Sequence, residues 1–165
     1  MKKIVFATLA VALSSGTAFA ASGNTSTAAG SASAVVVSPL VVTHDTGAVL
    51  NFGKFTVGTA GGTVVVTAAN VASVTSDVSF VPGNSTSADA FSVTGDASRA
   101  FSIATTSGSV TGPSTMNFTT SASAASGTLS ATGTAAFSVG GTLTVPSTAT
   151  AGTYTGTYDA TVTYN

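Results

Sequence analysis

The sequence predicts an all-β fold, an antiparallel β-sandwich of about eight to ten short strands, from three observations. Apolar and polar residues alternate with a period of two through the C-terminal stretch, residues 152–165. Short apolar runs recur along residues 34–165, and Gly, Pro, Asn and Asp separate them at regular intervals. Small and β-branched residues dominate, only 5% of the residues are charged, and Glu and Trp are absent. This composition suits strands better than helices.

The C-terminal stretch is the clearest strand in the sequence. Thr and Asp occupy its odd positions from 153 to 163. The even positions carry mostly larger residues, and we single out Gly152, Tyr154, Tyr158, Ala160, Val162 and Tyr164. Successive side chains of a strand point to opposite faces, so the even positions are expected to face a core and the odd positions to face water.

Residues 1–20 have the pattern of a secretory signal peptide. Lys2 and Lys3 precede an apolar run over residues 4–13, and the small-x-small sequence 18–20 follows it. The run is too short to span a bilayer as a helix. We therefore expect cleavage after residue 20 and export through the periplasm to the cell surface or the medium, without stable membrane insertion.

The remaining chain is expected to form one domain with a flexible start. Residues 21–33 are uncharged and of low complexity, whereas residues 34–165 carry the strand pattern. After the signal peptide the chain contains two basic residues and five Asp, so its net charge is negative and nucleic acid is a disfavoured partner. Because Cys is absent, the fold must be held by burial and strand pairing alone.

Several turns and phase changes are predicted along the domain. Pro39 favours an edge strand or a bend within residues 34–43. The apolar phase changes at Gly53, where a bulge would keep Leu50, Phe52, Phe55 and Val57 on the core side. Turns are expected at 61–62 and 140–141, where two glycines adjoin. The runs around Phe91/Val93 and Phe101/Ile103 are predicted to pair as a hairpin with their odd residues inward.

No residue pattern points to catalysis, a cofactor or a metal. His44 lies in a predicted turn over residues 44–47 and is expected to be an exposed turn residue. The five Asp residues lie mostly in turn-like Ser, Thr and Gly contexts, and their spacing matches no calcium loop. Without Cys or Glu, and with one His, no nucleophile–base pair is evident. We therefore predict a protein that is not an enzyme and has no cofactor or metal site.

The C-terminal stretch and the signal peptide together resemble subunits of the fimbrial (pilin-like) superfamily of Gram-negative bacteria. Gly152 is the fourteenth residue from the end and Tyr164 is the penultimate one. The segments Leu-Asn-Phe-Gly-Lys-Phe (50–55), Ala-Phe-Ser-Val-Thr-Gly (90–95), Phe-Ser-Val-Gly-Gly-Thr-Leu (137–143) and Gly-Thr-Tyr-Thr-Gly-Thr (152–157) are similar to an uncharacterised family of exported bacterial β proteins. That family is related to spore-coat-U-like and fimbrial domains.

The resemblance implies an immunoglobulin-like sandwich that lacks one strand. Its groove would be filled first by a strand of a periplasmic chaperone and then by the N-terminal segment of the next subunit. In the even phase the candidate donor residues are Ala28, Gly30, Ala32, Ala34 and Val36, with Val35 and Val37 in the other phase.

Three functional hypotheses follow. The first is a secreted, non-enzymatic structural subunit of a fimbria-like surface fibre or an extracellular coat, which forms a homopolymer by β-strand addition. The second is a self-complete, monomeric adhesin domain that binds a surface or a carbohydrate. The third is an amyloid-like matrix protein. The sequence leaves open whether residues 34–42 complete their own sandwich or a neighbour's.

Overall fold

The computed structural model describes residues 25–165, and all regular secondary structure among them is β-strand. Eleven strands form two antiparallel sheets, which confirms the predicted all-β sandwich with one strand more than the upper expectation. Val36–Asn165 forms one compact unit. Residues 25–35, described by themselves, are exposed and contain no strand. The predicted signal peptide lies outside the described residues.

The strands fall into one eight-stranded and one three-stranded sheet. Their bounds are β1 (Val41–His44), β2 (Phe55–Val66), β3 (Ala72–Phe80), β4 (Asp89–Thr94), β5 (Ala100–Thr105), β6 (Gly108–Thr111), β7 (Thr115–Ala122), β8 (Ser126–Thr128), β9 (Thr134–Val145), β10 (Thr155–Thr157) and β11 (Ala160–Tyr164). The large sheet has the order β1-β4-β9-β7-β6-β10, and β2 pairs with both β9 and β3. The small sheet has the order β11-β5-β8.

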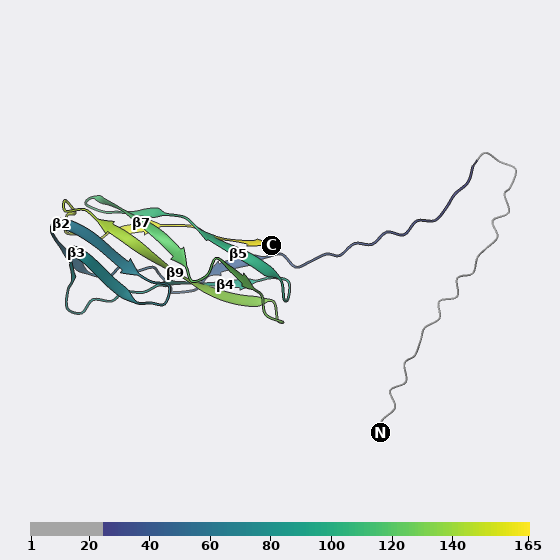
Figure 1. The fold of residues 1–165 in the computed structure, drawn as a ribbon, viewed down its shortest axis with the longest axis horizontal. Coiled ribbons are helices and arrows are strands. Elements are labelled where there is room, and N and C mark those ends of the chain that lie inside the picture. The colour runs from purple at the N-terminus through teal and green to yellow at the C-terminus, as the bar shows by residue number, and fades with distance from the viewer. Residues whose placement is uncertain (1–24) are drawn as a thin grey trace, which may run out of the picture. The chain divides into compact units, whose positions relative to one another are not determined.

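Strand β9 runs through the middle of the large sheet (Figure 1). Its first half pairs with β4, its second half pairs with β2, and β7 lies along its other edge. Gly140 lies at the change of partner, where a Cβ atom would collide with the backbone of Val66 and Ala68. The turn predicted at 140–141 is therefore wrong: the two glycines let three strands approach closely inside a continuous strand.

The second predicted glycine turn, at 61–62, is also wrong. Gly61 has φ +67° within β2, and the register against β3 shifts between Val57 and Gly62. The Asp77 carboxylate accepts a hydrogen bond from the Ala60 amide at 3.2 Å and so holds the extra residues of this bulge. Glycine here bends a strand without ending it.

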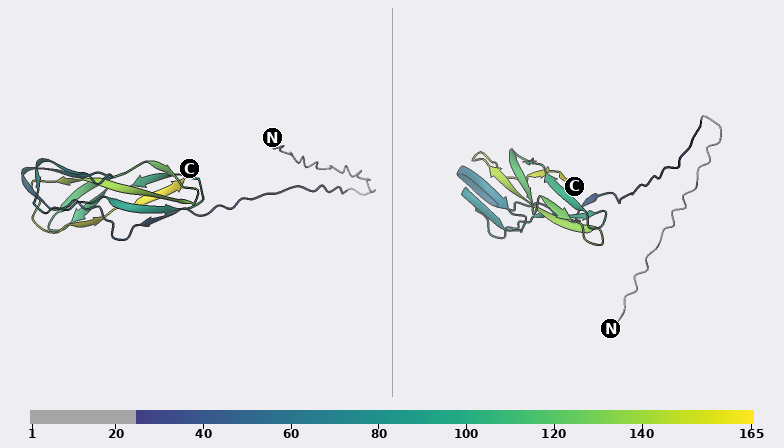
Figure 2. Two further views of the ribbon diagram at one scale, coloured as in Figure 1. Left: turned by 90° about the horizontal axis from the view of Figure 1, so that it is seen from below. Right: turned by 45° about the vertical axis from the view of Figure 1, so that its right-hand side comes forward.

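The predicted hairpin between the runs at Phe91 and Phe101 does not form. β4 pairs with β1 and β9, whereas β5 pairs with β11 and β8 in the other sheet. Figures 1 and 2 show β5 beside the C-terminal strand. Both Phe91 and Phe101 are nevertheless buried, as an inward odd phase requires.

The C-terminal stretch is split between the two sheets. β10 pairs with β6 in the large sheet, and β11 pairs with β5 in the small one, so the chain crosses at Tyr158 and Asp159. From 153 to 165 every odd residue is exposed, and every even residue except Gly156 is half-buried. The even side thus faces the interior, but neighbouring atoms cover it only in part.

The interior consists of two apolar clusters. The first contains Phe52, Val64, Val66, Val78, Met116, Phe118, Leu143 and Val145. The second contains Phe91, Val93, Phe101, Leu129, Phe137 and Val139. Tyr158 packs against both clusters, with T-shaped ring contacts to Phe118 and Phe91 at centroid distances of 6.2 and 6.3 Å. The crossing point of the chain therefore joins the two halves of the core.

Candidate functional site

The sandwich contains an open groove of about 1190 Å³. Residues 49–57 line one wall and residues 149–158 line the other. Met116, Phe118 and Leu143, all buried, form its floor. The groove is therefore apolar at its base and has a wall from each end of the sandwich sequence.

Gly53 shapes the first wall. It has φ +78°, which favours glycine, and its amide donates to Asn51 Oδ1 at 2.8 Å. The side chain of Asn84 accepts a hydrogen bond from the Lys54 amide. Leu50, Phe52, Phe55 and Val57 all pack on the first cluster, as predicted, but the strand begins only at Phe55. The expected bulged strand is thus a bend followed by a strand.

Tyr154 fixes the second wall. Its hydroxyl donates to the Thr150 carbonyl at 2.6 Å and lies 2.8 Å from Ser114 Oγ. Gly152 lies against the ring of Pro113, where a Cβ atom would collide. These contacts hold residues 149–154 as an ordered wall of the groove.

Both walls carry unpaired strand edges. Phe55–Val57 pairs with β3, and β2 begins to pair with β9 only at Gly62. β10 pairs with β6 and, among the described residues, with no other strand. Free amide and carbonyl groups on such edges can accept a further strand. The groove therefore offers backbone pairing along its walls and apolar contact at its floor.

A cluster of three polar side chains, called here the clamp, lines part of the groove. Asp89, only 5% exposed, accepts hydrogen bonds from His44 Nε2 at 2.6 Å and from the Tyr158 hydroxyl at 2.7 Å. The Ala90 amide donates to the same carboxylate at 2.9 Å. His44 ends β1, Asp89 starts β4 and Tyr158 leads into β11. The clamp thus ties the large sheet to the C-terminal segment.

The clamp perturbs the Tyr158 phenol. Burial raises its pKa far above 10.0, the usual value, and the hydrogen bond to Asp89 and the negative charge of Asp89 raise it further. The phenol therefore stays protonated and keeps donating to the carboxylate throughout the neutral range.

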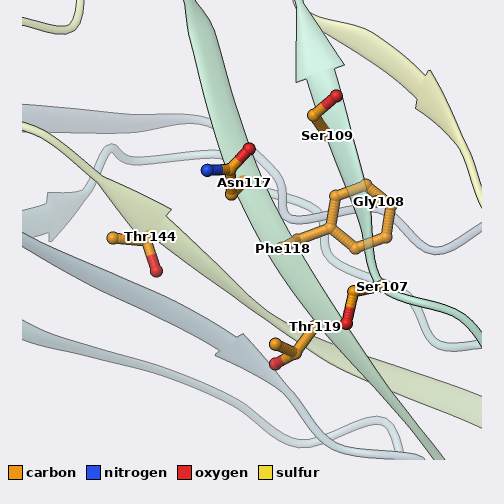
Figure 3. A pocket seen from close by; sticks show the side chains of 7 residues that line it. All are labelled: Ser107, Gly108, Ser109, Asn117, Phe118, Thr119 and Thr144. Carbon is orange, nitrogen blue, oxygen red and sulfur yellow. The ribbon is translucent and has the colours of Figure 1, made fainter.

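A second, smaller hollow of about 380 Å³ lies on the large sheet. Figure 3 shows Ser109, Asn117 and Thr144, which come from the neighbouring strands β6, β7 and β9, among its lining residues. Five of its seven lining residues carry a hydroxyl or amide group and none is charged, although most of the lining surface is apolar.

The structure brings only part of the predicted site together. Gly152, Tyr154 and Tyr158 line the groove, whereas Ala160, Val162 and Tyr164 lie beyond the clamp. Their alternate burial agrees with the expected phase. The candidate donor residues Ala28, Gly30, Ala32, Ala34 and Val36 are all exposed.

His44 and Asp89 are placed differently from expectation. His44 ends a strand, so its placement in a turn is wrong, but its side chain is exposed as expected, at 50%. Its imidazole also bonds a buried carboxylate, which was not expected. Asp89 was missed as a member of the site. It lies in the inward odd phase of Phe91 and Val93, and this position was the available signal.

Val41 and Val42 pair with Thr94 and Val93 of the same chain. The end of the 34–42 segment therefore completes its own sheet, and the strand starts only after Pro39. Residues 25–37 belong to no strand in the described structure. The ambiguous segment thus divides into a paired and an unpaired part.

Residues 25–165 lack two kinds of functional feature. No helix there combines the length and the apolar character that a membrane crossing requires. Within the same residues, no three His, Cys, Asp or Glu side chains gather in a way that could hold a metal ion.

Comparison with known proteins identifies a family without a known role. Residues 40–164 match the family model described as a domain of unknown function (DUF4402). The match covers most of the chain, which therefore belongs to this family. No curated protein and no solved structure matches the sequence.

Proposed function

We propose that this member of the DUF4402 family is a secreted, non-enzymatic structural subunit of a fimbria-like surface fibre or an extracellular coat. One copy inserts its N-terminal segment, defined here as residues 25–37, into the groove of the next copy. Repetition of this step gives a homopolymer, and a periplasmic chaperone strand would cover the groove before assembly. This mode of assembly is the one that the resemblance to pilin-like subunits implies.

The observation that carries the proposal is the pairing of an open groove with an exposed apolar segment in one chain. Val35 and Val36 are 89% and 96% exposed, and Val37 is also exposed. Burial of a valine side chain contributes about 1.5 kcal/mol or more. The groove has an apolar floor at Met116, Phe118 and Leu143, and its free strand edges supply the backbone partners. The segment thus offers exposed valines and an unpaired backbone, and the groove offers the apolar surface and the free strand edges that could bind them.

A second copy is favoured over self-insertion. The Tyr164 hydroxyl donates to the Ser38 carbonyl at 3.0 Å, while His44, at the other end of β1, borders the groove. Ser38 is therefore held near the end of β1 that does not border the groove, and self-insertion would require residues 25–37 to turn back along β1. Segment and groove of different copies meet without such a turn.

The absence of enzymatic activity is part of the proposal. His44 Nε2 and the Tyr158 hydroxyl both bond the Asp89 carboxylate. That arrangement ties two sheets together, and within residues 25–165 no Ser or Thr hydroxyl is hydrogen-bonded to His44 as a nucleophile–base pair requires. Export is supported by the pattern of residues 1–20, which precedes the described structure.

Deletion of residues 21–37 tests the proposal. The full chain is expected to form ladders of oligomers on the cell surface and fibres by negative-stain microscopy. The deletion variant is expected to unfold cooperatively as a monomer, because Val41–His44 and all other strands remain. A matched control replaces Val71, an exposed valine outside the segment, by Ser and should polymerise normally. Polymer of undiminished length from the deletion variant would refute the proposal.

The small hollow favours a second candidate function, an adhesin domain that binds a carbohydrate. Its hydroxyl and amide groups are the kind that pair with sugar hydroxyls. Under this hypothesis Asn117→Ala abolishes binding on a glycan array, whereas Asn51→Ala does not. A chain that binds no glycan in either form excludes the second candidate.

A further inference from the structure

The last strand holds the chain at the point where the N-terminal segment ends. The Tyr164 hydroxyl donates to the Ser38 carbonyl at 3.0 Å and accepts a hydrogen bond from the Asp96 amide at 2.6 Å. The Arg99 guanidinium lies over the Tyr164 ring, 5.3 Å from its centroid. We call these four residues the anchor. Because Ser38 directly follows the segment, the anchor fixes the point from which the segment leaves the sandwich.

The anchor rests on the second apolar cluster. Leu40 and Tyr164 both pack against this cluster. A Cβ atom on Gly95 would collide with the Tyr164 hydroxyl and would also crowd Leu40 and Leu129. The missing side chain at Gly95 therefore gives the hydroxyl its place beside the chain that leads into β1.

The chain on either side of Ser38 contains few residues that allow a reversal. Residues 31–44 include no Gly, Asn or Asp. The valines at 35–37 are β-branched and favour an extended backbone. The pair Ser38-Pro39 is the exception, because Ser is common at the first position of a type I turn and Pro at the second. A reversal in this stretch is therefore expected at that pair.

The anchor acts on the atom that such a turn requires. In a type I turn that starts at Ser38, the Ser38 carbonyl accepts a hydrogen bond from the Val41 amide. In the structure this carbonyl accepts from Tyr164 instead, and residues 36–40 contain no turn. Val41 pairs with Thr94 as the first residue of β1. The Tyr164 hydroxyl thus favours a straight entry into β1 over a reversed one.

A reversed entry matters because the segment and the groove belong to one chain. Extended, residues 25–37 reach about 40 Å, and the four residues of β1 cover about 13 Å. The far end of β1, at His44, borders the groove. The segment is therefore long enough to turn back along β1 and enter its own groove. A tethered strand competes at an effective concentration in the millimolar range, so it excludes a dilute second copy unless geometry prevents self-insertion.

We propose that the Tyr164 hydroxyl keeps the N-terminal segment out of its own groove and so leaves both free for a second copy. This inference rests on the proposed assembly by strand addition. Tyr164 does not line the groove and acts through Ser38, so it is a positioning residue. Loss of the hydroxyl frees Ser38-Pro39 to form a turn, and the product is a closed monomer with its own segment in its groove.

Removal of the hydroxyl tests the inference. Tyr164→Phe keeps the ring in the second cluster and beside Arg99 and removes only the oxygen. The full chain is separated by size-exclusion chromatography at several concentrations, and hydrogen exchange of residues 25–37 is measured in the monomer fraction. We expect the ratio of monomer to polymer to rise about fivefold, because one hydrogen bond is lost. The segment of this monomer should be protected from exchange and should stay protected on dilution, since self-insertion does not depend on concentration.

A matched control and a rescue separate this role from a general loss of stability. The Ser102 hydroxyl donates to the Thr163 carbonyl at 3.3 Å, so Ser102→Ala also removes a hydrogen bond to the last strand but leaves Ser38 held. It should polymerise like the unaltered chain. Ser38→Val in the Tyr164→Phe background replaces the turn-forming residue by a β-branched one and is expected to restore the polymer.

A second variant reaches the closed monomer without altering the anchor. An Asn-Gly pair inserted between Val37 and Ser38 supplies a turn just before the anchor. It should give the same protected monomer, and it replaces Tyr164→Phe as the test if that variant does not unfold cooperatively.

Each outcome has a definite consequence. The inference is overturned by a Tyr164→Phe chain that polymerises as well as the unaltered chain, by a monomer whose segment is unprotected, or by a monomer that Ser38→Val does not convert back to polymer. In those cases polymer formation by the unaltered chain still supports the proposed function. An unaltered chain that never polymerises overturns both.

Discussion

Replacement of Asp89 by Ala should destabilise the sandwich more than any other change of a single charged residue. The carboxylate accepts hydrogen bonds from His44, Tyr158 and the Ala90 amide at 2.6, 2.7 and 2.9 Å. A hydrogen bond to a charged group contributes about 1.5–3 kcal/mol. His44 is half-exposed and contributes least, and the cost of burying the charge offsets part of the total. We expect a net loss of about 3 kcal/mol in the free energy of unfolding.

The assay is thermal and urea unfolding of the purified full chain, followed by circular dichroism. A loss of that size should lower Tm by roughly 10 °C in a domain of this length. Asp89→Asn keeps the shape and one acceptor oxygen, so we expect about half the effect. Asp159→Ala is the matched control, because Asp159 adjoins Tyr158 in the sequence but is exposed.

Two results would refute this reasoning. One is an Asp89→Ala variant whose stability lies within about 0.5 kcal/mol of the unaltered chain, the range typical of neutral surface changes. The other is an equal loss in Asp159→Ala, which would show that charge in this region matters and the clamp does not.

Three further predictions concern the clamp, the core and the sheet. Because the pKa of Tyr158 is raised on folding, the unfolded chain loses the phenolic proton first. The stability that Tyr158 contributes is thus fully present below pH 10.0 and is lost as the pH rises above it. Urea unfolding at increasing pH should therefore show a shallower fall in the free energy of unfolding for Tyr158→Phe than for the unaltered chain. Phe118→Ala, at a 5% exposed ring, should cost about 3–5 kcal/mol in urea unfolding, and the same change at half-buried Phe55 should cost less. Gly140→Ala should yield little folded protein in a solubility assay, whereas Gly30→Ala, with open space around it, should yield the normal amount.

The parts of the fold that the sequence predicts are those that depend on side-chain phase. Burial alternates along the last strand region in the expected phase, and Phe91, Val93 and Phe101 face inward as odd residues. Phase depends on the two-residue repeat of a strand, which needs no knowledge of its partner. Asp89 is also an odd residue of β4, so its burial could have been predicted from the same two-residue repeat.

Strand pairing was not predictable from local signals. The two glycine pairs resemble turns, yet Gly61 lies in a bulge and Gly140 lies where three strands crowd together. The bulge and the close approach of strands both require a residue without a Cβ atom, and so do many turns. Only the position of a distant strand decides which of the three a glycine pair forms. β4 and β5 likewise adjoin in sequence but join different sheets, where β4 pairs with six residues of β9 and β5 pairs with five residues of β11.

The groove and the clamp share one cause, the crossing of the C-terminal stretch between sheets. Because β10 spans only three residues before the chain leaves for the small sheet, it covers little of the first cluster, and Leu50, Phe55, Val57 and Tyr154 stay half-buried. An inserted strand of mostly small residues would complete their burial, at about 25 cal/mol per Å² of apolar surface. The affinity of this strand then depends on the apolar surface that it covers in the acceptor as well as on its own side chains. A segment of Thr, Ser, Ala and Gly that ends in three valines can therefore still be held.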